Sequence, residues 1–134
     1  MRGKLLHVRY RVENLEESIR FYRDVLGLDL KSTAKSARGS ELAFFATPGG
    51  VEIEICRYAA SGPVTVCDDL THLAFAVDDL DAFGEHLRRH GVSFSDGPHG
   101  SKGKGRMAFV DAPEGYEVEI IEPPRAGAAG VDSV

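Results

Sequence analysis

The stretch TPGGVEIEI at Thr47–Ile55 returns as APEGYEVEI at Ala112–Ile120, and this repeat decides the fold of the chain. The two stretches start 65 residues apart (112 − 47), and the same offset carries LLHVRYRVENLEES, near the start of the chain, onto LTHLAFAVDDLDAF. A repeat that preserved only the fold would keep turns and apolar periodicity. This repeat also keeps two polar positions in each copy: His7 and Glu54 in the first, His72 and Glu119 in the second.

The composition is that of an ordinary globular protein. The chain has 134 residues, 43% apolar and 28% charged, which suffices for one domain with a sizeable core. The net charge of −5 argues against nucleic acid as the main partner. No apolar run approaches the roughly 20 residues of a membrane span, and no signal segment opens the chain. Cys56 and Cys67 have neither metal-site spacing nor a disulfide framework. We expect a cytoplasmic protein without nucleic-acid or membrane partners.

Each copy predicts the element order β-α-β-β-β. A short alternating strand begins at the histidine and is followed by a helix, with Asn14 and Asp79 as N-caps and Gly27 and Gly91 as C-terminal caps. Three further strands are expected in each copy, near 28–34, 41–47 and 51–58, and then near 92–95, 105–111 and 116–122.

The fold class is therefore α+β. Two tandem βαβββ modules, at about 5–58 and 71–122, are expected to form one domain over residues 1–122 with a curled mixed sheet. Residues 123–134, PPRAGAAGVDSV, are rich in Pro, Gly and Ala and have little to bury. This composition predicts a flexible C-terminal tail.

Strand periodicity separates the candidate ligands from the apolar core. Side chains two residues apart share one face of a strand, so Ile53 and Ile55 lie on the apolar face and Glu52, Glu54 and Cys56 on the other. The second copy repeats this pattern. If the sheet curls, the less apolar face becomes the wall of a cavity. Two imidazoles and two carboxylates on such a wall suit Zn²⁺, Ni²⁺, Co²⁺, Mn²⁺ or Fe²⁺.

A glycine-rich stretch, SKGKGR, contributes two further candidates. Lys102 and Lys104 lie in it, and a lysine-bearing glycine-rich loop can bind an anionic part of a substrate. Ordinary turn chemistry explains the same residues equally well.

The chain resembles the vicinal oxygen chelate superfamily and, within it, bacterial glyoxalase I (lactoylglutathione lyase). Four blocks carry the resemblance over about residues 5–122: LLHVRYRVENLEESIRFYRDVLGLDL, GVEIEI, THLAFAVDD and FVDAPEGYEVEIIE. The resemblance implies that His7, Glu54, His72 and Glu119 bind a metal at the interface of a homodimer. One subunit would contribute the first two ligands and the other subunit the last two. It also implies Ni²⁺ as the metal, because the compact bacterial members use Ni²⁺ or Co²⁺.

The same resemblance implies a reaction. Glyoxalase I isomerises the hemithioacetal of a 2-oxoaldehyde, methylglyoxal, and a thiol such as glutathione into an S-lactoyl thioester. Glu119 would be the base that moves the proton, and Glu54 the opposite ligand and a second candidate for the shuttle. Arg11 matches a family arginine and would bind a substrate carboxylate.

Other activities of the superfamily remain open. The segment Cys56–Ala60 lacks the aromatic residues that follow the first glutamate ligand in the bacterial lyase, and the chain has no Trp. An epimerase of the methylmalonyl-CoA type usually has Gln in place of Glu54. A thiol transferase or a small extradiol dioxygenase uses two histidines and one glutamate. A drug-sequestering resistance protein is expected to have lost the ligands, and this chain retains all four.

Overall fold

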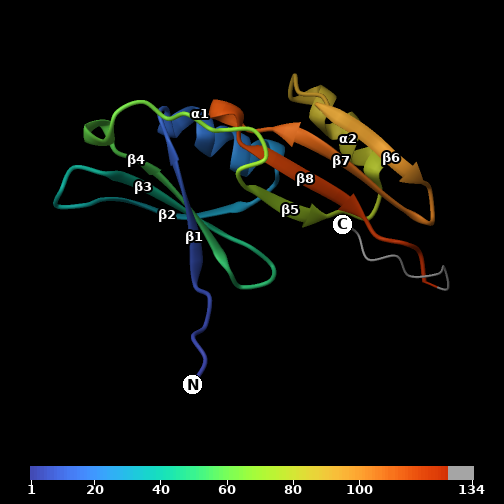
Figure 1. The fold of residues 1–134 in the computed structure, drawn as a ribbon, viewed down its shortest axis with the longest axis horizontal. Helices are drawn as coiled ribbons and strands as arrows, with labels where there is room; N and C mark the ends of the chain where they lie inside the picture. The colour runs from blue at the N-terminus through green and yellow to red at the C-terminus, as the bar shows by residue number, and fades with distance from the viewer. Residues whose placement is uncertain (127–134) are drawn as a thin grey trace. The chain divides into compact units, whose positions relative to one another are not determined.

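The structure is a computed structural model that describes residues 1–126. The chain divides into two compact units, Met1–Thr65 and Val66–Val134, here called unit 1 and unit 2 (Figure 1). These correspond to the two predicted repeats, and their union into one domain stays a prediction. Of the predicted tail, residues 127–134 lie outside the described part of the chain. Within the described part of the tail, the Arg125 backbone N–H donates to the Gly103 carbonyl at 3.1 Å.

Both units follow the predicted element order. Unit 1 contains β1 (His7–Val12), α1 (Leu15–Arg20), the π-helical turn η1 (Phe21–Val25), β2 (Asp29–Lys35), β3 (Glu41–Ala46), β4 (Glu52–Arg57) and the 3₁₀ turn η2 (Ala59–Ser61). Unit 2 contains β5 (His72–Ala76), α2 (Leu80–Arg89), β6 (Asp96–Ser101), β7 (Gly105–Asp111), the 3₁₀ turn η3 (Pro113–Gly115) and β8 (Glu117–Glu122).

Each unit builds its own four-stranded mixed sheet. The strand order is β1-β4-β3-β2 in unit 1 and β5-β8-β7-β6 in unit 2. In both sheets the first strand pairs with the last in parallel, and the remaining neighbours are antiparallel. The predicted α+β fold of two βαβββ modules is confirmed. This topology places the histidine strand of each unit directly beside its glutamate strand.

The helices begin where the sequence predicts. The Asn14 side chain accepts a hydrogen bond from the Glu17 backbone N–H at 3.0 Å, and the Asp79 side chain accepts bonds from the first turn of α2. Such N-caps satisfy backbone donors that have no partner inside the helix. Gly27 and Gly91 follow the two helical segments with φ of 75° and 72°, a conformation that glycine adopts without steric cost. No helix among residues 1–126 is long and apolar enough to cross a membrane.

The apolar faces of the two sheets form the cores. In unit 1 the helical segment contacts β3 and β4, and in unit 2 α2 contacts β8. The largest fully buried side chains of the two cores include Tyr22, Phe45 and Ile55 in unit 1, and Leu80, Leu87 and Ile120 in unit 2. Burial of each such side chain contributes roughly 1.5–3 kcal/mol. The opposite face of each sheet is thereby left for polar side chains.

The expected strand near 92–95 is wrong, because strand β6 begins only at Asp96. The Val92 backbone N–H instead closes the end of α2 by donating to the Leu87 carbonyl at 2.9 Å. The Phe94 ring lies against Gly84 of α2, so close that a Cβ at Gly84 would stand 3.1 Å from the ring. The apolar residues of this segment therefore cover the helix instead of extending the sheet.

A largely buried ion pair joins β7 to the end of β8, and its carboxylate also accepts a hydrogen bond from the start of α2. Arg106 Nη2 donates to Glu122 Oε2 at 2.6 Å, and the Leu80 backbone N–H donates to the same oxygen at 2.8 Å. Arg106 also contacts Asp81 at 3.1 Å. Hydrogen bonding to Arg106 lowers the pKa of Glu122 to about 2, against an ordinary 4.5. The carboxylate is thus held in its charged form by both a strand and a helix.

Replacement of Glu122 by Gln is expected to lower the free energy of unfolding by roughly 2–3 kcal/mol at neutral pH, since Arg106 loses the more buried of its two carboxylate partners. Because the folded-state pKa of Glu122 is depressed, its contribution is complete above about pH 4.5 and is lost as the pH falls toward about 2. Urea unfolding of both proteins from pH 7 to pH 2 checks this. A stability difference that did not shrink over that interval would contradict the assignment.

Candidate metal centre

The first histidine and glutamate meet on the polar face of unit 1. His7 begins β1, Glu54 lies in the middle of β4, and the parallel pairing of these strands brings the two side chains together. His7 Nε2 lies 3.2 Å from Glu54 Oε2. The imidazole side chain is 46% exposed, whereas the carboxylate side chain is 3% exposed. The Phe44 ring stands edge-on to the imidazole at a centroid distance of 6.3 Å.

Unit 2 repeats this arrangement. His72 begins β5, and its Nε2 lies 3.2 Å from Oε1 of Glu119 in β8. The side chains are 43% and 4% exposed, close to the values in unit 1. The Phe109 ring stands edge-on to this imidazole at 5.5 Å. The two repeats therefore reproduce the histidine, the glutamate and the aromatic neighbour.

The burial of the two carboxylates makes a positively charged partner favourable. Burying an ionised carboxylate is costly unless it is paired or coordinates a metal. Among the described residues, Glu119 has only His72 as a charged or hydrogen-bonding partner. Glu54 is paired with His7 and with Arg9, whose Nε donates to Glu54 Oε1. Each pair places a half-exposed imidazole beside a buried carboxylate, a donor arrangement that suits a divalent metal.

Each unit by itself supplies two of the four predicted ligands. Within residues 1–126 there is no group of three or more His, Cys, Asp or Glu side chains that can hold a metal ion. The His7–Glu54 and His72–Glu119 pairs, here called half-sites, are thus incomplete as metal centres. Zn²⁺ sites usually have three or four protein ligands, and each half-site has two.

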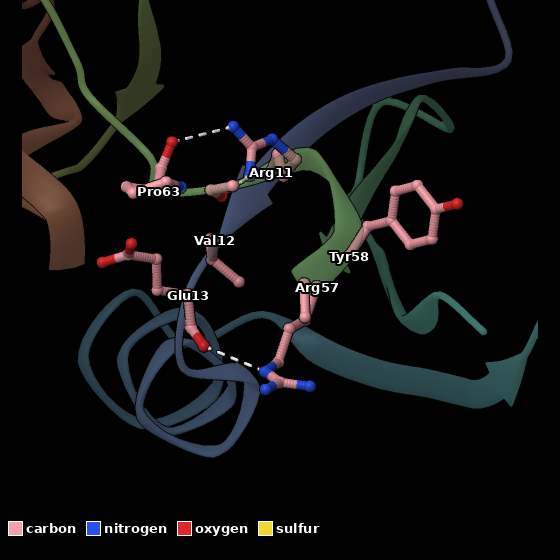
Figure 2. Close-up of a pocket in the computed structure, with 8 residues that line it drawn as sticks. Arg11, Val12, Glu13, Arg57, Tyr58 and Pro63 are labelled. Carbon is pink, nitrogen blue, oxygen red and sulfur yellow. Dashed lines mark hydrogen bonds between the residues drawn. The ribbon is translucent and has the colours of Figure 1, made fainter.

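Arg11 is already engaged in backbone contacts. Its guanidinium donates to the carbonyl oxygens of Gly62 at 2.7 Å and Pro63 at 3.2 Å, which ties the segment after β4 to the end of β1 (Figure 2). Arg11 also lines a cavity of about 280 Å³ together with Glu13 and Tyr58. The predicted contact of Arg11 with a substrate carboxylate stays a prediction.

A second cavity of unit 1 carries a concentration of positive charge. It has a volume of about 330 Å³, and among residues 1–126 its lining includes Arg9, Arg11 and Arg38 but no acidic residue. Cys56 lines the same cavity as a buried free thiol. Three guanidinium groups in one cavity of an acidic chain favour an anionic ligand. Because Arg9 also contacts Glu54, this basic cavity adjoins the first half-site.

Lys102 lies apart from the second half-site. It follows β6, and its Nζ is 3.9 Å from Oδ2 of Asp81 in the first turn of α2. The helix α2 covers the apolar side of its sheet, whereas His72 and Glu119 project from the polar side. The structure therefore does not bring Lys102 together with the predicted ligands, and its substrate contact stays a prediction.

Sequence reasoning missed three neighbours of the predicted ligands: Phe44, Phe109 and Arg9. The repeat offset itself connects the two phenylalanines, because 44 + 65 = 109. Their register positions, opposite Glu54 and opposite Glu119, follow from the β3–β4 and β7–β8 pairings. Arg9 has no counterpart in the second copy, so the repeat gave no signal for it.

Comparison with known proteins identifies the family of the chain. A model of the Glyoxalase/Bleomycin resistance protein/Dioxygenase superfamily matches residues 4–120. A protein named lactoylglutathione lyase from Haemophilus influenzae is 35% identical over 125 residues, which cover 89% of this chain and 92% of the relative. A protein of the same name from Salmonella typhimurium is 33% identical over 130 residues, covering 92% and 96%.

The fold is also shared with solved structures. The trypanothione-dependent glyoxalase I of Leishmania major matches with a TM-score of 0.75 at 25% identity, covering 90% of this chain and 86% of that one. The family match spans nearly all of the described residues, including both half-sites. The chain therefore belongs to the glyoxalase/bleomycin resistance protein/dioxygenase superfamily, which is the vicinal oxygen chelate superfamily indicated by its sequence motifs.

Proposed function

We propose that the protein is a metal-dependent lactoylglutathione lyase of the glyoxalase I type. Its substrate is the hemithioacetal of methylglyoxal and a thiol, with glutathione as the first candidate. The observation that carries the proposal is the pair of half-sites, in which each copy of the repeat buries a glutamate beside a half-exposed histidine. The relatives named lactoylglutathione lyase, at 33–35% identity over nearly the whole chain, support the same conclusion.

The metal is proposed to be held by His7, Glu54, His72 and Glu119. Two imidazoles and two carboxylates suit the divalent ions from Mn²⁺ to Zn²⁺, with Ni²⁺ preferred here by resemblance to the compact bacterial enzymes. When bound, the ion supplies a Lewis acid that polarises the substrate oxygens. The half-sites are proposed to combine across a homodimer, so that one subunit contributes His7 and Glu54 and its partner the other two. Closed twofold dimers are the commonest oligomers.

Glu119 is proposed to move the proton. Its carboxylate accepts the proton from C1 of the hemithioacetal. The electron pair of the broken C–H bond forms the C1–C2 double bond of an enediolate, and the π pair of the C2 carbonyl moves onto its oxygen. The same carboxylate then returns the proton to C2, the proton of the C1 hydroxyl passes to the oxygen on C2, and C1 becomes the thioester carbonyl. Burial removes competing water from Glu119, and the His72 contact at 3.2 Å involves only one of its two carboxylate oxygens.

The basic cavity is proposed to hold the anionic part of the thiol. Glutathione has two carboxylates, and Arg38 and Arg11 line a cavity to which the described part of the chain contributes no acidic side chain. Guanidinium groups bind carboxylates through paired hydrogen bonds. Arg11 lines this cavity and also donates to the backbone carbonyls of Gly62 and Pro63, and its contact with the thiol is part of the proposal.

The proposal is tested by following thioester formation from methylglyoxal and glutathione with metal-stripped protein. We expect negligible turnover without metal and restored turnover on addition of Ni²⁺, with Zn²⁺ as the comparison that tests metal preference. Equal turnover with and without metal would contradict the role of the ion. Absence of turnover from protein shown to bind Ni²⁺ would contradict this substrate and favour another activity of the superfamily.

A further inference from the structure

The two half-sites differ at one position. In unit 1 the parallel pairing of β1 and β4 places Arg9 opposite Glu54. In unit 2 the corresponding pairing of β5 and β8 places Ala74 opposite Glu119. These positions are equivalent by the repeat offset, since 9 + 65 = 74. The chain thus keeps the histidine, the glutamate and the phenylalanine in both copies and changes the residue beside the carboxylate.

The change alters how firmly each carboxylate is held. Both oxygens of Glu54 have a partner, because Arg9 Nε donates to Oε1 and His7 Nε2 lies 3.2 Å from Oε2. Among residues 1–126, Glu119 has His72 alone, at Oε1. A guanidinium–carboxylate contact is a strong, charge-assisted hydrogen bond, and it restrains a side chain that would otherwise change rotamer. Glu54 is therefore fixed, whereas Glu119 retains an oxygen with freedom to move.

We propose that Arg9 is a positioning residue that keeps Glu54 a permanent metal ligand, and that Ala74 leaves Glu119 free to leave the ion and move the proton. This inference rests on the proposed function, and it explains why two glutamates in repeated surroundings take different roles. A carboxylate held by both a metal and an arginine cannot readily turn toward substrate. A partner that orients a metal ligand in this way typically accounts for a factor of about 10–100 in metal affinity.

The test removes the arginine opposite Glu54 in the first copy and, in separate variants, introduces an arginine opposite Glu119 in the second. Arg9→Ala removes the restraint from Glu54, and Arg9→Lys keeps the charge without the planar fork. Ala74→Arg places a guanidinium opposite Glu119. Ala76→Arg is the matched control, since residue 76 is two positions along the same strand, exposed, and opposite Ile121 instead of Glu119. The readouts are Ni²⁺ affinity by chelator competition, the visible spectrum of the Co²⁺-loaded protein, and kcat and KM measured separately.

We expect Arg9→Ala to weaken Ni²⁺ binding by about 10–100-fold and to change the Co²⁺ spectrum, with partial recovery in Arg9→Lys. Ala74→Arg is expected to lower kcat by about 100-fold or more, because the new guanidinium restrains Glu119, the proposed base. It should not weaken Ni²⁺ binding. Ala76→Arg should leave Ni²⁺ affinity and kcat near the wild-type values.

Several results would refute the role of Arg9 and leave the proposed function standing. One is an unchanged Ni²⁺ affinity and Co²⁺ spectrum in Arg9→Ala. Another is a rise in KM as the only effect of Arg9→Ala, which would make Arg9 a substrate-binding residue of the basic cavity. Wild-type kcat in Ala74→Arg, or an equal loss in Ala76→Arg, would also refute it. Wild-type protein that binds no metal would instead overturn the proposed function, and this inference with it.

Discussion

Replacement of Glu119 by Gln is expected to lower kcat by about 10²–10⁴-fold, the usual contribution of a positioned general base. Glutamine has nearly the same size as glutamate and retains an oxygen donor, but it cannot accept the proton from C1. The side chain lies on β8 and is 4% exposed, so a near-isosteric change should leave the sheet intact. The measurements are kcat at saturating Ni²⁺, bound metal per chain, and the circular dichroism spectrum.

The matched control is Glu117→Gln. Glu117 lies on the same strand and on the same face as Glu119, but it stands opposite His72 and accepts a hydrogen bond from the Asp69 backbone N–H at 3.3 Å. We expect its kcat to stay close to the wild-type value. Near-normal turnover in Glu119→Gln, or an equal loss in both variants, would contradict the assignment of Glu119 as the base.

Replacement of either His7 or His72 by Ala is expected to abolish metal binding at stoichiometric concentrations. Each half-site supplies only two ligands, and removal of one imidazole leaves a single carboxylate on that side. The loss should exceed the factor of about 10–100 that follows removal of a residue that merely orients a ligand. Metal per chain after equilibrium dialysis against Ni²⁺ measures the effect, and turnover should disappear with the metal.

His99→Ala is the control for these variants. His99 forms a closer pair with a carboxylate, its Nε2 lying 2.8 Å from Asp96 Oδ1, but both side chains are more than half exposed. A surface pair of this kind contributes little to stability or binding. We expect His99→Ala to bind Ni²⁺ as the wild type does. Full metal content in either His7→Ala or His72→Ala would show that the ligand set is wrong.

The repeat explains how much of the site could be predicted from the sequence. Strand periodicity placed Glu54 and Glu119 opposite the apolar residues of their strands, and the shared offset connected each to a histidine. The structure brings both pairs to 3.2 Å. The shared strand face and the shared offset together are informative, because a polar residue on the surface by chance has no reason to recur at the same offset in the second copy.

Contacts that depend on a single copy could not be predicted in this way. From the sequence alone, Arg9 is interpreted as a solvated charge on an alternating strand. Only the register with β4 shows that it lies against Glu54. The backbone partners of Arg11 depend on the path of the chain after β4, which periodicity does not determine. Phe94 was misassigned for a related reason, since a short apolar run can cover a helix as well as extend a sheet.

The most direct test of the shared metal centre is the activity of a mixed dimer. His7→Ala and His72→Ala chains are produced together with different affinity tags, and the dimer carrying both tags is purified. If each centre takes His7 and Glu54 from one subunit and His72 and Glu119 from its partner, one centre of this dimer is intact and the other lacks both histidines. We predict about half of the wild-type turnover per dimer, although each variant alone is inactive. Turnover no higher than that of either variant alone would contradict a centre shared between subunits.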